Sequence, residues 1–198
     1  MSSDARPGQY SPQKVMDLHT PDEASLPDDL KPYFQKCRDK LGMVPNVLRA
    51  WLLRPEKLRT FIASYNELML GASGLSKLER EMIAVAVSAV NRCYYCLVAH
   101  GAAVRQMSGD PELGEMLVMN YRVAELPARQ RAMLDFAVKL TETPHMITAN
   151  DRASLSAQGF SDEDIFDICE VAGFFNMTNR VAHGVDMMPN PDYHRQAR

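Results

Sequence analysis

The stretch from Met82 to Val90 has the composition of one apolar helix, and that helix must end before a cysteine pair that follows it closely. Asn91 and Arg92 come next, and asparagine is a common helix terminator. A second helix that opens at Cys93 then runs back beside the first. The sequence therefore predicts an antiparallel helix pair around Asn91, and no alternating Val/Ile/Thr stretch in the chain argues for a sheet.

The second helix carries the residues with chemical potential. Cys93, Cys96 and His100 share one helical face, and helical side chains lean toward the N-terminus, which directs the imidazole back at Cys96. The positive end of the helix at Cys93 also favours a thiolate.

An acid on the first helix completes the predicted site. Glu81 lies twelve residues before Cys93, and unbroken helix would hold the two roughly 18 Å apart. Because Glu81 lies ten residues before Asn91 and His100 nine after it, the fold-back brings the acid level with the imidazole. A carboxylate that orients an imidazole, which in turn takes a thiol proton, is an established way to activate a thiol.

Other readings of the cysteine pair have less support. A structural zinc site needs four ligands, usually from a second Cys/His pair, whereas Cys37 and Cys169 stand alone. We therefore predict no metal and no cofactor. A structural disulfide is disfavoured because no signal peptide precedes it and cytosolic thiols are normally reduced. Chance occurrence of a lone Cys-x-x-Cys motif is the remaining alternative.

The full spacing closely resembles the core of the alkyl hydroperoxidase D family within the carboxymuconolactone decarboxylase superfamily. The resemblance is strongest over residues 75–105 and extends over roughly 40–185, with upstream segments similar to the peroxidase-related branch. The residues that carry it are Glu81-x11-Cys93-x2-Cys96-x3-His100, the preceding Leu75-Ser76-x2-Glu79-Arg80, Val44-Pro45-Asn46 and Arg54-Pro55.

The resemblance implies an all-helical homo-oligomer, a trimer or hexamer, whose thiols reduce hydroperoxides and are re-reduced by a dithiol reductant or redox protein. Carried over residue by residue, Cys96 attacks the peroxide, Cys93 resolves the product, and Glu81 with His100 relays protons. Two alternatives stay open. One is a lactone decarboxylase, as in the namesake branch, and the other is a non-catalytic helical oligomer.

One residue departs from the family pattern. The best-studied members carry a histidine between the two cysteines, where this chain has Tyr95. A phenol, with a reference pKa of about 10, is a poor base at neutral pH. We expect a weaker peroxidase, or one that acts on a different oxidant or disulfide.

Size and charge fit a single helical domain. A chain of 198 residues with 46% hydrophobic content can bury one good core. We assign residues 28–198 to it and residues 1–27, rich in proline, to an extended arm that packs onto the body or a neighbour. The net charge of −3 and the lack of a Lys/Arg block argue against nucleic acid or an anionic membrane as a partner. With no apolar run long enough to span a membrane, we expect a cytoplasmic protein.

Eight helices are predicted along the domain, and two of them match as an internal repeat, with chance similarity between amphipathic helices as the alternative. Residues 75–87 match residues 126–138 at a constant offset of 51, but Glu81 aligns with Ala132 and His100 with Asp151, so the second copy keeps the packing pattern without the chemistry. The predicted helices are Asp28–Leu41, Pro55–Leu70, Ser76–Val90, Cys93–Met107, Pro111–Val118, Pro127–Thr141, Ala149–Gln158 and Asp162–Val181.

Four polar residues on the last helix form a second candidate patch: Asn176, Asn179, Arg180 and His183. They could line the mouth of the thiol pocket, with Arg180 binding a polar substrate group. The alternative, which the sequence favours, is a buried polar seam between subunits or a solvated helix end, because most polar stripes carry no chemistry.

Overall fold

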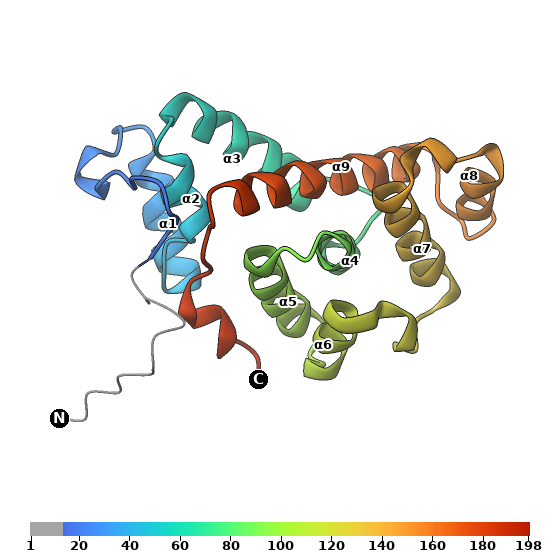
Figure 1. Cartoon of the computed structure of the whole chain (residues 1–198). Coiled ribbons are helices and arrows are strands. Elements are labelled where there is room, and N and C mark those ends of the chain that lie inside the picture. Colours follow the sequence, from blue (N-terminus) through green and yellow to red (C-terminus); the bar gives the residue numbers. More distant parts are fainter. Residues whose placement is uncertain (1–13) are drawn as a thin grey trace.

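The computed structural model describes residues 14–198, which form nine α-helices, four short 3-10 helices and no strand (Figure 1). The predicted all-α fold, a single helical domain, is confirmed. The α-helices are α1 (Lys31–Leu41), α2 (Asn46–Trp51), α3 (Pro55–Leu70), α4 (Lys77–Val90), α5 (Tyr94–Ser108), α6 (Pro111–Asn120), α7 (Ala128–Glu142), α8 (Ala149–Ser156) and α9 (Asp162–Gly184). The 3-10 helices are η1 (Glu23–Ser25), η2 (Tyr121–Val123), η3 (Pro144–Met146) and η4 (Pro191–His194).

Helix α2 is the element that the sequence analysis missed. It has six residues and begins directly after Pro45, which occupies the N-cap position. A helix this short shows less than two turns of apolar periodicity, so it is hard to distinguish from a loop. Helix α9 also runs three residues further than predicted, to Gly184.

Helix α4 is the centre of the molecule. All ten residues from Glu79 to Ser88 are buried, and the six from Met82 to Val87 are apolar on every side, as expected for a central helix. Helices α5, α6, α7 and α9 pack around it, and Figure 1 shows α4 end-on with these helices on its flanks. Each fully buried Met, Ile or Val side chain of α4 contributes roughly 1.5–3 kcal/mol by leaving water.

Helix starts follow the capping rules. Ser76 and Glu79 form a reciprocal capping box at the start of α4, and Ser161 and Asp164 form another at the start of α9. Each box is visible in the sequence as a serine three residues before an acid, Ser76-x2-Glu79 and Ser161-x2-Asp164. Caps of this kind stabilise a helix by about 1 kcal/mol each and fix where it begins.

The internal repeat has a structural counterpart. Arg80 in the first turn of α4 donates to the carbonyls of Leu68 and Gly71 at the end of α3. Arg131, 51 residues later in α7, donates to the carbonyls of Tyr121 and Ala124 beyond the end of α6. In both copies an arginine satisfies the free carbonyls that a preceding helix leaves at its C-terminus.

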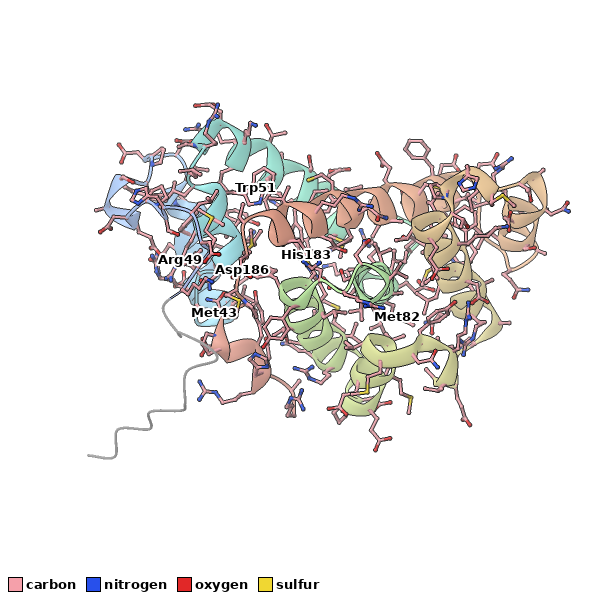
Figure 2. The ribbon with its side chains drawn as sticks, in the orientation of Figure 1. Met43, Arg49, Trp51, Met82, His183 and Asp186 are labelled. Atoms are coloured by element: carbon pink, nitrogen blue, oxygen red, sulfur yellow. The ribbon has the colours of Figure 1, made fainter. Side chains whose placement is uncertain are left out.

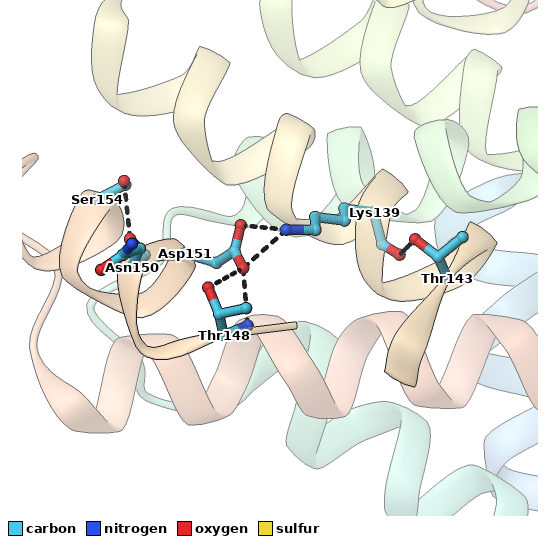
Figure 3. Close-up of polar contacts among 6 residues, drawn as sticks. All are labelled: Lys139, Thr143, Thr148, Asn150, Asp151 and Ser154. Atoms are coloured by element: carbon cyan, nitrogen blue, oxygen red, sulfur yellow. Dashed lines mark hydrogen bonds and ion pairs between the residues drawn. The ribbon is translucent and has the colours of Figure 1, made fainter. Parts of the chain in front are cut away.

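In the second copy the residue that aligns with His100 is Asp151, which forms a capping box with Thr148 at the start of α8. Asp151 accepts hydrogen bonds from the backbone and side chain of Thr148, at 2.7 and 2.8 Å, and from Lys139 Nζ at 2.6 Å (Figure 3). These bonds, that from Lys139 first, lower the pKa of Asp151 to about 2. The second copy is thus a packing duplicate, held by an ion pair where the first copy has an imidazole.

Part of the predicted arm lies along the body. Residues 1–13 fall outside the described residues; beyond them, Val15 and Met16 are buried. The backbone of residues 15–17 exchanges hydrogen bonds of 2.9 Å with Val185 and Met188, just after α9. The boundary at residue 27 stays a prediction. Among residues 14–198 no helix is long and apolar enough to cross a membrane.

Candidate active site

The cysteine pair follows a sharp turn between α4 and α5. Helix α4 ends at Val90, and Cys93 is the N-cap of α5, with its backbone N–H bonded to the Ser88 carbonyl at 2.9 Å. The helix ends where the sequence predicted, with Asn91 as the C-cap of α4, and the left-handed residue of the turn is Arg92, with φ 54°. A non-glycine residue in this conformation costs about 1–2 kcal/mol, and such strain clusters at functional sites.

The fold-back brings the acid to the histidine. His100 Nδ1 lies 2.6 Å from Glu81 Oε2, with both side chains largely buried. An ionised carboxylate only accepts, so Nδ1 carries the hydrogen and Nε2 is the ring nitrogen free to exchange a proton. The edge of Phe175 packs on the imidazole at 4.6 Å between ring centroids, which helps to fix its orientation. The contact predicted between Glu81 and His100 is therefore present.

The two cysteines are free thiols that share a hydrogen bond. This bond, against the opposing effect of burial, lowers the pKa of Cys93 to about 6, with further help from the charges of His183 and His100. The same bond and burial raise the pKa of Cys96 well above its ordinary value. The surroundings thus favour the thiolate on Cys93 and a retained proton on Cys96.

This charge distribution differs from the order that the family resemblance implies. There Cys96 is the attacking sulfur, which requires the thiolate to form on Cys96. Here the Cys96 thiol donates to Cys93. Exposure does not separate the two sulfurs, because Cys93 is 1% and Cys96 4% exposed. Proximity to His100 alone does not decide the matter, because the hydrogen bond between the sulfurs is the largest influence on both.

A buried polar network ties the cysteine turn to α9. Asn91 Nδ2 donates to the side-chain oxygens of Asn176 and Asn179, at 3.0 and 2.9 Å. Asn179 Nδ2 in turn donates to Ser88 Oγ at 3.0 Å, and both Asn179 and Ser88 are fully buried. Asn179 and Ser88 also hydrogen-bond the sulfur of Cys96, where they favour its charged form.

Two exposed side chains end this network at the surface. Arg180 Nη1 donates to the backbone and side-chain oxygens of Asn176, at 2.6 and 3.0 Å. His183 Nε2 lies 3.0 Å from the Asn91 carbonyl. Of the four polar residues predicted on α9, Asn176 and Asn179 belong to a hydrogen-bond network inside the protomer. Arg180 and His183 are exposed at its edge.

Comparison with known proteins gives the same family as the motif. The model of the carboxymuconolactone decarboxylase family matches residues 55–137. The structure of an uncharacterized peroxidase-related protein from Silicibacter sp. TM1040 is 61% identical, with a TM-score of 0.92, over 96% of this chain and 100% of that one. This chain belongs to the carboxymuconolactone decarboxylase family. A comparison with curated proteins gives no match.

Within the superfamily the chain falls on the peroxidase-related branch. An uncharacterized peroxidase-related protein from Ralstonia eutropha JMP134, described as an alkylhydroperoxidase AhpD core, is 42% identical with a TM-score of 0.91, over 93% of this chain and 97% of that one. The debrominase Bmp8 shares the fold, with a TM-score of 0.78 at 17% identity over 92% of this chain and 97% of that one.

The departure of this family member at Tyr95 has a structural explanation. The phenol is buried, and its oxygen accepts a hydrogen bond from the backbone N–H of Val47 at 3.0 Å, so the side chain joins α5 to α2. Burial raises the pKa of Tyr95 well above 10. Tyr95 is a packing residue here and is not placed to act as a base.

Three residues of the site were not singled out from the sequence: Ser88, Asn91 as a hydrogen-bond donor, and Phe175. Ser88 carried a usable signal, since it is the only polar residue in the apolar stretch from Met82 to Val90. Asn91 contacts two residues of α9 that follow it by 85 and 88 positions in the chain. No local sequence pattern predicts such contacts.

Proposed function

We propose that this chain is a thiol-dependent hydroperoxide reductase that works through a Cys93–Cys96 disulfide. The observation that carries the proposal is the pairing of a thiolate-favoured cysteine with a protonated one, beside a histidine held by a buried acid. A thiolate is the nucleophilic form of cysteine, and a nearby second thiol is typical of redox-active cysteines. The peroxidase-related relatives support the same reaction class.

The first step uses the charge that the site stabilises at rest. The Cys93 thiolate attacks the terminal oxygen of a hydroperoxide, the O–O bond breaks, and the alkoxide leaves and takes a proton from water. Cys93 is then a sulfenic acid, oxidised by two electrons, while the peroxide has been reduced to an alcohol.

The second step uses the acid–histidine pair. Cys96 gives its proton to His100 Nε2, attacks the Cys93 sulfur and forms the disulfide. The hydroxide that leaves Cys93 takes up that proton and departs as water, and Glu81 stabilises the transient imidazolium. A dithiol reductant or redox protein then restores both thiols by exchange.

The assembly and setting belong to the proposal as well. We expect a homo-oligomer, a trimer or hexamer as the family resemblance implies, that works in the reducing cytoplasm with no nucleic-acid or membrane partner. The branch that carries the family name suggests a lactone decarboxylase as the alternative, and cysteine-independent decarboxylation would favour it.

Trapping the sulfenic acid in single-cysteine variants tests the order of attack. In Cys96→Ser the serine keeps an O–H donor for Cys93, so we expect a sulfenic acid on Cys93 after one equivalent of peroxide, detected with a dimedone probe and mass spectrometry. Cys93→Ser should trap much less. A sulfenic acid found only in Cys93→Ser would restore the order implied by the resemblance, with Cys96 as the attacking sulfur.

The same experiment discriminates between the functions. Cys37→Ser/Cys169→Ser serves as the control and should react as the wild type, because burial raises the pKa of both of these thiols. Inertness of all variants to several hydroperoxides, together with stoichiometric zinc binding, would favour the non-catalytic oligomer instead.

A further inference from the structure

A pocket of about 320 Å³ lies where α1, α2 and the segment after α9 meet, and no residue of the thiol mechanism lines it. Figure 2 labels two of its residues, Met43 and Arg49, near that segment. Its volume is within the range of small-molecule sites, roughly 300–1,000 Å³. Part of its wall is the Val44-Pro45-Asn46 motif, to which the proposed reaction gives no role.

Two buried asparagines form the polar wall of the pocket. Asn46 and Asn190 are only 4% and 6% exposed. Asn190 uses both ends of its amide, because Oδ1 accepts from the Asn46 backbone N–H at 2.7 Å and Nδ2 donates to the Val44 carbonyl at 2.9 Å. Asn46 uses only one end: Nδ2 donates to the Met188 carbonyl at 2.9 Å, and Oδ1 accepts no hydrogen bond from any described residue.

The free oxygen of Asn46 is open to the pocket. Among the buried and half-buried residues of the described chain, only Arg49 Nε and Arg80 Nε are side-chain polar atoms sealed from solvent without a hydrogen bond. Asn46 Oδ1 therefore reaches solvent, and the pocket is the opening that Asn46 lines. An amide oxygen in a buried residue is satisfied only when an O–H or N–H donor enters the pocket.

Two arginines of the pocket converge on one carboxylate. Glu23 contacts Arg38 Nη2 through Oε2, and its Oε1 lies 2.9 Å from Arg49 Nε, an ion pair without hydrogen-bond alignment. The other N–H groups of both guanidinium groups have no hydrogen bond or ion pair within residues 14–198. Glu23 balances one of the two positive charges, so one is left for an anion, and guanidinium groups bind carboxylates best.

We propose that this pocket binds a small monocarboxylic acid that carries a hydroxyl or ammonium group beside its carboxylate. The free N–H groups of Arg38 and Arg49 donate to the carboxylate, and Asn46 Oδ1 accepts from the hydroxyl or ammonium group. Asn46 and Arg49 are three residues apart on α2, so their side chains are neighbours on one helix face and can hold adjacent groups of one ligand.

The remaining lining restricts the ligand further. Asp192 is exposed at the pocket and repels a second acid group. The ligand's apolar part has three apolar side chains to contact: Met43, Val44 and Pro191. The inference therefore adds a binding site to the proposed thiol chemistry and does not depend on it.

Three matched acids test the ligand class on the full chain: mandelate with a hydroxyl, phenylglycine with an ammonium group, and phenylacetate with neither. We expect saturable, one-to-one shifts of the Asn46 side-chain amide in NMR titrations with the first two, and at least threefold weaker binding of phenylacetate. No saturable binding of mandelate or phenylglycine would overturn the proposal. Equal affinity for phenylacetate, or tighter binding of inorganic phosphate, would also contradict it.

Three variants test the arginines. Arg49→Met should weaken mandelate binding roughly tenfold or more, as loss of a charged hydrogen bond does. Glu23→Gln removes the competing charge at similar shape and should tighten binding severalfold. Arg152→Met, at an exposed arginine on α8, is the control. Wild-type affinity in a folded Arg49→Met protein would overturn the site, whereas failure to reduce hydroperoxides would leave it intact, because no cysteine takes part.

Discussion

At the scale of single residues, the position of one proton decides the chemistry. Cys93 and Cys96 are both buried and share a hydrogen bond, yet their surroundings differ. Cys93 lies at the start of α5 and is influenced by two imidazoles, while Cys96 is one turn further in and meets Ser88 and Asn179. The thiol pair and its histidine could be predicted from spacing. The place of the proton could not, because it depends on groups that α9 brings from far along the chain.

The Glu81→Gln variant tests the acid at this scale. Glutamine keeps the shape but removes the negative charge that would stabilise the imidazolium formed when His100 takes the Cys96 proton. Loss of one charged hydrogen bond costs about 1.5–3 kcal/mol, so disulfide formation should slow roughly ten- to hundredfold. Attack by Cys93 should change less, and the sulfenic acid should accumulate in single-turnover experiments against pH.

Two comparisons make this prediction sharp. Glu115→Gln, an exposed acid on α6, is the matched control and should behave as the wild type. His100→Ala should be at least as slow as Glu81→Gln, and the double variant little slower, because residues that act as a unit are not additive. An equal rate of disulfide formation in Glu81→Gln and wild type would remove the acid from the mechanism.

At the scale of elements, periodicity and capping residues predicted most of the fold. Helix α4 was predictable from its apolar composition and its capping box, and the break after Val90 follows from the spacing of Glu81 and Cys93. Helix α2 was not predictable, because six residues give too little periodicity. The repeat could also be recognised in the sequence. The shared role of Arg80 and Arg131 could not be predicted, because it depends on where the preceding helices end in space.

The repeat makes a stability prediction. Arg80 is 3% exposed and satisfies two carbonyls at the end of α3. Arg80→Met should fill similar space yet leave both carbonyls unpaired, which costs roughly 1–3 kcal/mol in the free energy of unfolding. Urea denaturation measures this loss. Lys77→Met, at an exposed position in the same turn, is the control, and equal stability of the two variants would contradict the capping role.

At the scale of the whole molecule, exposed apolar side chains indicate surfaces for association. Among the described residues, Met119, Phe166 and Val123 are each more than 60% exposed, at 81%, 63% and 61%. A pocket of about 340 Å³ between α3 and α9 is lined by Trp51, Phe61 and other side chains. Burial of such side chains between copies of the chain is what the proposed homo-oligomer would provide.

Light scattering at micromolar concentration tests the oligomer. We expect a mass that is a multiple of the 22.2 kDa chain. Phe166→Glu should shift the protein toward smaller species with unchanged helix content, because a charge at an apolar interface is costly to bury. Glu163→Gln, exposed on the same helix, is the control. A monomeric wild type would contradict the expected assembly.

The central claim is that Cys93 and Cys96 form one redox unit, distinct from the other two thiols, and differential alkylation after brief hydroperoxide treatment tests it most directly. The account predicts an intramolecular Cys93–Cys96 disulfide by peptide mass spectrometry, while Cys37 and Cys169, whose pKa values burial raises, stay reduced. A dithiol should reverse the change. Equal alkylation of all four cysteines before and after peroxide would contradict the account.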